Sequence, residues 1–459
     1  MSNITLTAGV RQNLLSLQQT ADLMSQTQNR LATGKKVNSA LDNPLNFFTS
    51  SSLSARASDL SNLLDSMSNG IQTIQAANNG LTAMTSLVQQ LQATVSQARG
   101  DSTAAAITLG IMKGRMYRCS CTRCLNLLLT YPEGCRANCA YCGLARHREA
   151  ERDYADRNFI RVDWPAVPLE QTIDIVAGHG EKSPFHRMCI SMITHPRSDE
   201  DTVTVLKAWT DRIDPSTVPV SILSNPTTMR RTDVQRLKDL GADIFTVALD
   251  AATPEIFDRT RGKGVQSPHS WGHYWQILED ARDIFGPQKF GAHIIVGMGE
   301  SEHDTLSLVQ RLVDMGGHSH MFCFFPEKGS LMDHLPATPR DQWRRVQLGR
   351  YLIDYRGVRV DQMRFDGEGR VIDFGIPTGE LDDVIDQGVA FRTSGCPGKV
   401  AEDVSACDRP YGDSPPSNIA SYPFQPNRGD IRKIRRQLRI VAKKAAPATS
   451  DAAASDAAD

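Results

Sequence analysis

The first hundred residues carry a helical pattern of apolar positions. A helix is predicted from Val10 to Leu31, ending near Gly34, and the turn-rich segment Asn38–Pro44 predicts a break before a second helix. In the second helix, mostly apolar residues follow alternating steps of four and three at Leu60, Leu64, Met67, Ile71, Ile74, Asn78, Leu81, Thr85, Val88, Leu91 and Val95. Such a seam must be buried against another helix, so the pattern predicts an all-α hairpin that needs partners.

Further along, the pattern changes to short apolar runs separated by helical segments. Helices are predicted at Asp199–Arg212 and Thr232–Leu240. The predicted strands are Met188–Ile193, Pro219–Ser224, Ile244–Leu249, Ala292–Val296 and His320–Phe325. This alternation is typical of βαβ units, so we expect an α/β fold with a parallel sheet, either open or closed into a partial or full barrel.

The composition changes where the pattern changes. Cys, Trp, Tyr and His are absent before Tyr117, and all four occur after it. We therefore expect a helical region at 1–100, a linker or seam at 101–116, a larger domain at 117–440 and a disordered tail at 441–459 that is rich in Ala, Ser and Asp.

Charge and hydropathy exclude several protein classes. The net charge is -1 and hydrophobic residues make up 40% of the 459 positions, so the whole chain is neither disordered nor a generic nucleic-acid binder. We find no run of 18 apolar residues and no secretory signal pattern, so we expect no membrane span and a cytoplasmic location.

Six of the ten cysteines lie between Cys119 and Cys142. Without a secretory signal, such clustering favours metal ligation over disulfides. Cys135, Cys139 and Cys142 have the spacing C-x3-C-x2-C, which lets one loop offer three thiolates to one cluster. Three ligands leave one iron of a four-iron cluster open for an exogenous ligand, whereas the alternative of a structural zinc site needs a fourth protein ligand.

Three motifs of the first region resemble bacterial flagellins. They are Arg30–Gly34, Val37–Asn43 and Asn69–Leu81, and the resemblance covers residues 1–100. It implies export and assembly through flagellin-like helices, hence a secreted location in the bacterial flagellum. Nothing near the end of the chain resembles the carboxy-terminal half of a flagellin, and a generic coiled coil is the alternative.

The three-cysteine loop resembles that of the radical S-adenosylmethionine (SAM) superfamily, in which Tyr141 matches an aromatic residue beside the adenine. The resemblance implies a [4Fe-4S] cluster and SAM as cofactors, an electron donor such as ferredoxin or flavodoxin, and a 5′-deoxyadenosyl radical that abstracts hydrogen from the substrate. Three further segments, Ala248–Phe257 with the following Arg259 and Arg261, Gly297–Glu300, and Phe325–Ser330, resemble biotin synthase and lipoyl synthase.

The resemblance nominates cofactor-binding residues, with one departure. Ser191–Pro196 stands where many family members have a Gly-Gly-Glu type turn, so Ser191 or Thr194 would take over the contact to the methionine amino group. His195 is expected to be a packing residue. The expected cofactor-binding residues are Tyr141, Ser191, Asp250, Arg261, Gly297 and Glu300.

A second set of cysteines could hold an auxiliary iron-sulfur cluster if the barrel brings its ends together. These are Cys119, Cys121, Cys124, Cys396 and Cys407, with a zinc site or partly unused thiols as alternatives. Cys189 and Cys323 are expected to be small buried residues. The segments Arg392–Pro397, Cys407–Tyr411 and Ser421–Phe424 resemble the end of the biotin-synthase-like subunits of two-component lipoyl synthases, and Arg392, Thr393 and Ser394 are similar to a cluster-binding Arg-Ser-Ser element of lipoyl synthases.

The leading hypothesis is therefore sulfur insertion into an unactivated carbon-hydrogen bond, with an octanoyl group on a lipoyl carrier protein as the expected substrate and a second synthase subunit as a partner. A radical mutase or lyase without sulfur donation is the first alternative. The second is a structural subunit of the flagellum or an accidental gene fusion. A basic run from Arg432 to Lys444 offers a contact for an acidic carrier protein or for nucleic acid, although a solvated helix face is the favoured explanation.

Overall fold

The structure is a computed structural model that describes residues 7–96, 99–100, 102–111, 113, 123–148, 167–397, 405–408, 413–414 and 417–444. The chain divides into two compact units, Met1–Gln89 and Gln90–Asp459. Cys119, Cys121, Tyr411 and the predicted tail from residue 445 lie outside the described residues. The domain boundaries expected from composition stay a prediction.

The first unit is helical, as its apolar pattern predicts. Helix α1 spans Ala8–Thr33 and ends at Gly34, whose φ of 64° is the left-handed conformation that glycine adopts easily. Helix α2 spans Pro44–Ser96. In the turn between them, the Asp42 carboxylate accepts hydrogen bonds from the backbone N–H groups of Asn38 and Ser39 at 3.0 and 2.9 Å. The sequence therefore located both the helices and their break.

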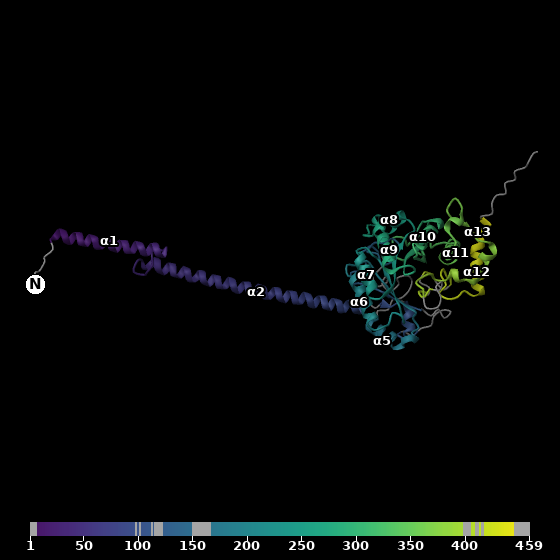
Figure 1. The fold of residues 1–459 in the computed structure, drawn as a ribbon, viewed down its shortest axis with the longest axis horizontal. Coiled ribbons are helices and arrows are strands. Elements are labelled where there is room, and N and C mark those ends of the chain that lie inside the picture. The colour runs from purple at the N-terminus through teal and green to yellow at the C-terminus, as the bar shows by residue number, and fades with distance from the viewer. Residues whose placement is uncertain are drawn as a thin grey trace, which may run out of the picture. The chain divides into compact units, whose positions relative to one another are not determined.

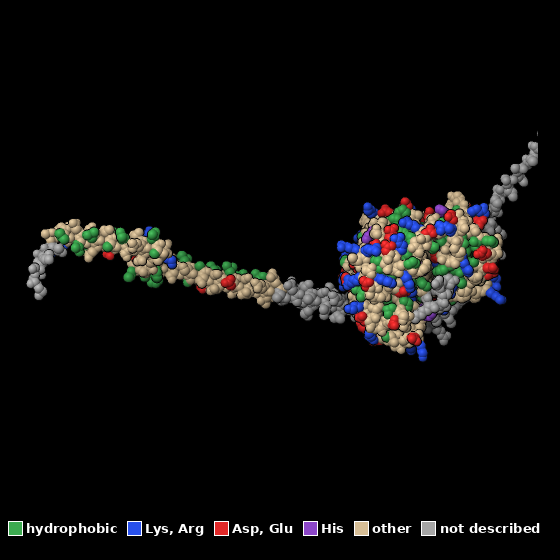
Figure 2. Space-filling view, viewed as in Figure 1, with side chains coloured by type: hydrophobic (Ala, Val, Ile, Leu, Met, Phe, Trp, Pro, Cys, Tyr) green, Lys and Arg blue, Asp and Glu red, His purple; other side chains and the backbone are tan. Residues whose placement is uncertain are grey.

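The seam residues of α2 whose burial is described stay exposed in this unit. Leu60, Leu64, Met67 and Ile71 are each more than half exposed, and α1 has no buried residue. Figure 2 shows hydrophobic side chains at the surface along the helices of this unit. The expected burial of the seam against another helix is thus not seen within the described part of the first unit.

Figure 1 shows the helices and strands of the second unit. The unit is built on one sheet with the strand order β1-β2-β3-β4-β5-β6-β7. Strands β2 to β7 are parallel and form a half-barrel, and β1 pairs antiparallel with β2. The strands are β1 (Arg99–Gly100), β2 (Cys124–Leu128), β3 (Arg187–Ser191), β4 (Val220–Ser224), β5 (Ala242–Asp250), β6 (Phe290–Val296) and β7 (His318–Cys323). The prediction of a parallel α/β sheet is confirmed, and β2 is the parallel strand that the sequence analysis missed.

Helices connect the strands and cover one side of the sheet, leaving the other side to line a cavity. The helices are α3 (Ser102–Thr108), α5 (Leu169–His179), α6 (Ser198–Thr210), α7 (Arg231–Asp239), α8 (Pro254–Thr260), α9 (Trp271–Phe285), α10 (Glu302–Asp314), α11 (Arg340–Arg356), α12 (Thr378–Gln387) and α13 (Arg428–Lys444). Helix α6 packs on β3, α9 on β5 and β6, and α10 and α11 on β7. Trp209, Tyr274, Phe245 and Phe290 are fully buried there and anchor the core by apolar burial.

The segment after α12 folds back onto α11 and β7. Trp343 Nε1 donates to the Ala420 carbonyl at 3.0 Å, and the buried Arg344 guanidinium donates to the Ile419 carbonyl at 2.8 Å. The Ser394 hydroxyl accepts from the Met321 N–H at 2.7 Å. These contacts return Cys396 and Cys407 to the sheet, which is the condition under which an auxiliary cysteine set is expected.

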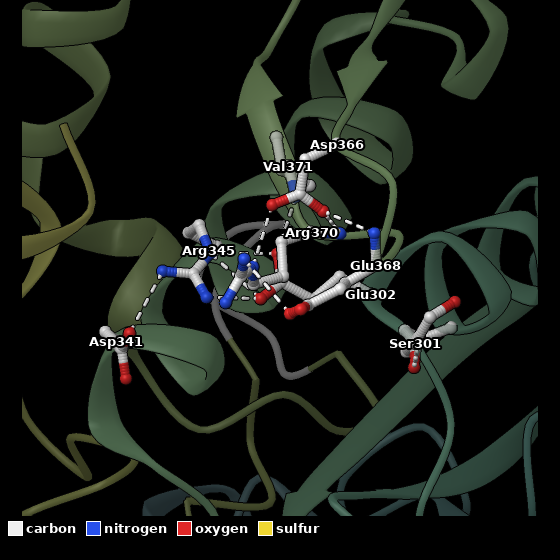
Figure 3. A network of polar contacts seen from close by, with 9 residues as sticks. Ser301, Glu302, Asp341, Arg345, Asp366, Glu368, Arg370 and Val371 are labelled. Carbon is white, nitrogen blue, oxygen red and sulfur yellow. Dashed lines mark hydrogen bonds and ion pairs between the residues drawn. The ribbon is translucent and has the colours of Figure 1, made fainter. Parts of the chain in front are cut away.

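A polar network fastens the start of α10 to α11 and to the hairpin of β8 (Arg364–Phe365) and β9 (Val371–Asp373), as Figure 3 shows. Glu302 Oε1 accepts from Arg345 Nε at 2.9 Å, and Glu302 Oε2 accepts from the Val371 N–H at 2.8 Å. The Glu302 and Arg345 side chains are almost fully buried. Because α10 follows β6 directly, this network fixes the turn at the end of β6.

Among the described helices, none has the length and apolarity needed to cross a bilayer.

The basic run of α13 contacts a neighbouring helix. Arg435 forms an ion pair with Asp386 of α12 at 2.9 Å. This part of the run therefore lies against a neighbouring helix.

Candidate active site

A cavity of about 220 Å³ lies inside the half-barrel, and it is lined by most of the predicted site residues. Gly297 and Glu300 do not line it. The predicted residues that do are Cys124, Cys135, Cys139, Tyr141, Cys142, Ser191, Asp250, Arg261, Cys396 and Cys407. Residues that lie far apart in the sequence, such as Cys124 and Cys407, thus share one cavity.

The loop after β2 carries the C-x3-C-x2-C motif, and neighbouring segments hold its backbone. The Arg136 N–H donates to the Thr194 carbonyl at 2.7 Å, and the Ala140 N–H donates to the Thr260 carbonyl at 2.7 Å. The Ala140 carbonyl in turn accepts from the Met332 N–H at 2.9 Å. The loops after β3 and β7 and the end of α8 therefore fix the path of the chain between the cysteines.

The three thiols of this loop have surroundings that suit iron-sulfur ligation. Backbone N–H groups donate to two of the sulfurs, from Ala137 to Cys135 Sγ and from Leu144 to Cys142 Sγ, both at 3.4 Å. Such hydrogen bonds are among the protein's means of tuning a cluster. Burial raises the pKa of Cys139 to about 11 and that of Cys142 above its usual range. Buried thiols of this kind become thiolate ligands when a cation binds them.

A single metal ion and a four-iron cluster require different arrangements of their protein ligands. Within the part of the chain that the structure describes, no three Cys, His, Asp or Glu side chains are grouped as the ligands of a single metal ion. A four-iron cluster takes one thiolate on each of several irons, so its cysteines need not converge on one point. The loop therefore fits a cluster with three cysteine ligands and an open iron.

A buried polar network lies beside the thiols. Tyr141 donates from its phenol to Asp250 Oδ2 at 2.5 Å, and Arg261 pairs with Asp250 through Nη1. Arg261 also donates to the Tyr141 phenol at 2.7 Å and to the Asn225 side-chain oxygen. Asp250 ends β5 with a φ of 63°, which is uncommon outside glycine. Burial raises the pKa of Cys139, and the positive charge of Arg261 lowers it. Arg261 therefore favours the thiolate form of Cys139.

The turn after β3 departs from the family pattern and has a structural role. The Thr194 carbonyl holds the cysteine loop through Arg136, and Ser191 lines the cavity. His195 is buried and stacks on Tyr131 with ring centroids 3.8 Å apart. This stacking agrees with the expectation that His195 packs.

The turn after β6 is held together by its own residues. Glu300 accepts hydrogen bonds from the backbone N–H groups of Gly297 and Met298, the second at 3.0 Å. Gly297 has a φ of 110°, and a Cβ atom there would overlap Thr338 Oγ1 and lie 2.9 Å from Thr338 Cβ. The close approach that Gly297 permits is thus to the threonine that precedes α11. The cofactor contacts expected for Gly297 and Glu300 stay a prediction.

A second group of thiols lines the cavity. Cys124, Cys189 and Cys407 are buried against one another, and the Cys124 and Cys407 sulfurs each lie 3.6 Å from the Asn126 side-chain oxygen. Cys396 is also buried and lines the cavity. Of the predicted auxiliary set, the structure brings together Cys124, Cys396 and Cys407.

Cys189, which the sequence predicts to be a small buried residue, also lies beside the second group of thiols. It is buried as expected, and it also contacts two cysteines of the predicted auxiliary set. A sequence signal was available, because Cys189 lies two positions before Ser191 on β3 and therefore shares its face of the strand.

Three histidines that line the cavity were not predicted from the sequence. His269, His293 and His320 line it, and the rings of His293 on β6 and His320 on β7 are 5.1 Å apart. Adjacent parallel strands place these two rings side by side, through the register that pairs His293 with His320. Neither histidine belongs to a motif that the sequence analysis used.

Arg187 joins the auxiliary cysteines to the sheet. Its guanidinium donates to the Pro397 carbonyl at 2.9 Å, to Ser221 Oγ at 2.9 Å and to Asp243 at 2.7 Å. Pro397 directly follows Cys396, so a buried cation fixes this cysteine next to β3 and β4.

Solved structures to which this chain is similar include the following three. Methylornithine synthase (PylB) has 15% identity and a TM-score of 0.35 over 51% of this chain and 61% of that one. HydG, a maturase of the [FeFe]-hydrogenase, has 15% identity and a TM-score of 0.39 over 51% and 50%. The radical SAM methyltransferase TsrM from Kitasatospora setae has 13% identity and a TM-score of 0.30 over 45% and 38%. The chain spans less than two thirds of the length of each of these proteins.

Family models match two separate parts of the chain. Residues 7–108 match the bacterial flagellin N-terminal helical region, and residues 129–312 match the radical SAM superfamily. Among curated proteins, none matches the chain. The matches agree with the helical first unit and the half-barrel second unit: this chain carries a radical SAM domain behind a flagellin amino-terminal region.

Proposed function

We propose that the second unit is a radical SAM enzyme that inserts sulfur into an aliphatic carbon-hydrogen bond. The observation that carries the radical chemistry is the meeting of the three-thiol loop with Tyr141, Asp250 and Arg261 around one cavity. When bound, a [4Fe-4S] cluster and SAM supply reductive cleavage of the sulfonium and a 5′-deoxyadenosyl radical. An electron donor such as ferredoxin or flavodoxin is the expected partner.

The chain's own residues bind, orient and exclude water. Cys135, Cys139 and Cys142 would hold the cluster, and Arg261 would offer positive charge to the SAM carboxylate. Tyr141 and Asp250 fix the position of Arg261 through the hydrogen bonds described above. Since Cys139, Arg261 and Asp250 are buried, the reacting groups would be screened from water.

Sulfur insertion is supported by the second group of thiols in the same cavity. Cys124, Cys189, Cys396 and Cys407 all line it, together with apolar side chains such as Leu128. An apolar lining suits an octanoyl chain, and four thiols suit an auxiliary iron-sulfur cluster as the sulfur source. A lipoyl carrier protein and a second synthase subunit are the partners that this proposal requires. A radical mutase or lyase would use the same cavity without needing these thiols.

The radical assignment is tested with the full chain, reconstituted anaerobically with iron and sulfide and reduced in the presence of SAM. We expect 5′-deoxyadenosine from the wild type and none from Cys139→Ala. Cys323→Ala is the matched control, because Cys323 is buried and lines the cavity but belongs to β7 and not to the three-thiol loop. Product formation that persists in Cys139→Ala would refute the assignment.

Iron counting tests the sulfur source. Two four-iron clusters predict about eight irons per chain, and Cys189→Ala or Cys396→Ala should lower this to about four while SAM cleavage continues. About four irons in the wild type would remove the auxiliary cluster and favour the mutase or lyase.

A structural role for the first unit is the second candidate function, favoured by the exposed seam of Leu60, Leu64, Met67 and Ile71. Flagellin-like helices would cover such a seam. The alternative of an accidental fusion is tested by sequencing the transcript across codons 95 to 120. One continuous message would support a genuine single protein, and two separate messages would refute it.

A further inference from the structure

His269 is a buried polar side chain in the cavity that no motif predicted. It lies just before α9, only 4% of its surface is exposed, and it lines the cavity. Its Nδ1 is 2.7 Å from both Thr227 Oγ1 and Tyr274 Oη. Its Nε2 is buried and has no hydrogen-bond partner among the described residues.

The neighbours of Nδ1 decide which ring nitrogen carries the proton. Arg261 Nη2 donates to Tyr274 Oη at 3.2 Å, which leaves the phenol's own proton available for His269 Nδ1. Burial raises the pKa of Tyr274, so the phenol keeps that proton. Burial, followed by the charge of Arg261, lowers the pKa of His269 to about 2, so the ring is neutral. Nδ1 therefore accepts, and Nε2–H is a donor.

The network around His269 has more donors than acceptors. Arg261 Nε is also buried and, within the described residues, has no partner. The acceptors Asp250 and Asn225 already receive hydrogen bonds from the same guanidinium. A buried donor without an acceptor costs free energy. A ligand that brings acceptor oxygens would therefore stabilise this site. Beside a guanidinium, the matching group is a carboxylate.

The segment that carries His269 also touches the cysteine loop. The Asn138 N–H donates to Ser267 Oγ at 3.1 Å, and the Asn138 side-chain amide donates to the Val265 carbonyl at 2.9 Å. Asn138 directly precedes Cys139, and Ser267 lies two residues before His269. A carboxylate at His269 would therefore lie close to the thiols.

We propose that His269 binds the α-carboxylate of SAM, donating from Nε2 beside Arg261. This inference rests on the proposed function, in which SAM brings a carboxylate to the thiols whereas an octanoyl chain held as an amide has none. His269 thereby sets the orientation of the amino-acid end of SAM without taking part in proton transfer.

The test measures SAM binding by equilibrium dialysis on the full chain, reconstituted anaerobically with iron and sulfide. His269→Phe and His269→Ala remove the donor, and the one that keeps the wild-type iron content decides. We expect dissociation constants about tenfold to a hundredfold weaker, as for the loss of a hydrogen bond to a charged group. His269→Gln, which keeps an N–H donor, should recover most of the affinity.

Two controls separate the carboxylate from other effects. His273→Ala should bind SAM within about twofold of the wild type, because His273 on α9 bonds to the Pro226 carbonyl and does not line the cavity. The probe 5′-methylthioadenosine, which lacks the amino-acid end, should bind equally to the wild type and to His269→Phe.

The outcomes are distinguishable. Unchanged SAM affinity in a cluster-loaded His269→Phe would overturn the inference and leave the proposed function standing. An equal loss for SAM and for 5′-methylthioadenosine would place His269 at the nucleoside and overturn the carboxylate assignment. A wild-type chain that binds neither iron nor SAM would refute the proposed function and this inference together.

Discussion

Tyr141, the residue before the third cysteine of the motif, donates a hydrogen bond of 2.5 Å to Asp250 Oδ2 at the end of β5. The two residues are far apart in sequence, and the buried Arg261 joins them because it contacts both. One carboxylate thus balances one guanidinium while a phenol fixes its orientation.

Asp250→Ala should destabilise the second unit by about 3–5 kcal/mol, because it leaves the buried Arg261 without its counter-charge. Tyr141→Phe removes the two hydrogen bonds of the phenol but keeps the ion pair, so it should cost only about 1–2 kcal/mol. Urea unfolding followed by tryptophan fluorescence measures both, since all five tryptophans lie after residue 117. Equal losses for the two variants would show that the ion pair does not dominate this network.

Gly297→Ala should cost about 3 kcal/mol or more, because the added Cβ atom would overlap Thr338 Oγ1 in a backbone conformation with a φ of 110°. Gly357 is the matched control. Its φ is 68° and a Cβ atom added there would meet nothing within 4 Å, so Gly357→Ala should cost only about 1 kcal/mol for the strained backbone. Thermal unfolding of both variants checks the difference, and similar shifts in Tm would contradict the steric argument.

Glu302→Ala should destabilise the second unit by about 3–5 kcal/mol, since it leaves the buried Arg345 of Figure 3 with only the more exposed Asp341, at 3.4 Å, as a counter-charge. The matched control is Glu368→Ala, which removes an exposed partner of Arg370 and should change the unfolding free energy by less than about 1 kcal/mol. The double variant Glu302→Ala with Arg345→Met should recover part of the loss, because no buried charge is left over. Failure to recover would mean that packing, and not charge, sets the cost.

His269 predicts a dependence of stability on pH. Its pKa is about 2 in the folded chain against 6.5 in the unfolded chain, so only the unfolded chain takes up the proton as the pH falls below 6.5. His269 therefore leaves the free energy of unfolding unchanged above pH 6.5. Lowering the pH from 6.5 to about 5 should reduce that free energy by about 2 kcal/mol. His269→Gln should show a correspondingly smaller fall in urea unfolding between these pH values. Parallel falls in both proteins would contradict a neutral buried His269.

The cysteine loop and the repeating elements could be predicted because both are local properties. The spacing of Cys135, Cys139 and Cys142 places three thiols on one short loop whatever the rest of the chain does. Hydrophobic periodicity located α1, α2 and five of the parallel strands within a few residues. The strand β2 is not evident from periodicity, because all five of its residues, Cys124–Leu128, are buried and so show no alternation between a buried and an exposed face.

By itself, then, the sequence determined which residue types are present at ligand spacing and where a helical region gives way to a parallel sheet. Only the tertiary structure decided which distant residues share a cavity, because strand register and the return of the segment after α12 are set by packing over the whole unit. That packing brings Cys189 to Cys124 and Cys407, and it turns the Glu300 carboxylate toward the backbone N–H groups of Gly297 and Met298. It also leaves His269 Nε2 buried at the cavity, a consequence of burial and hydrogen bonding that no spacing of residues encodes.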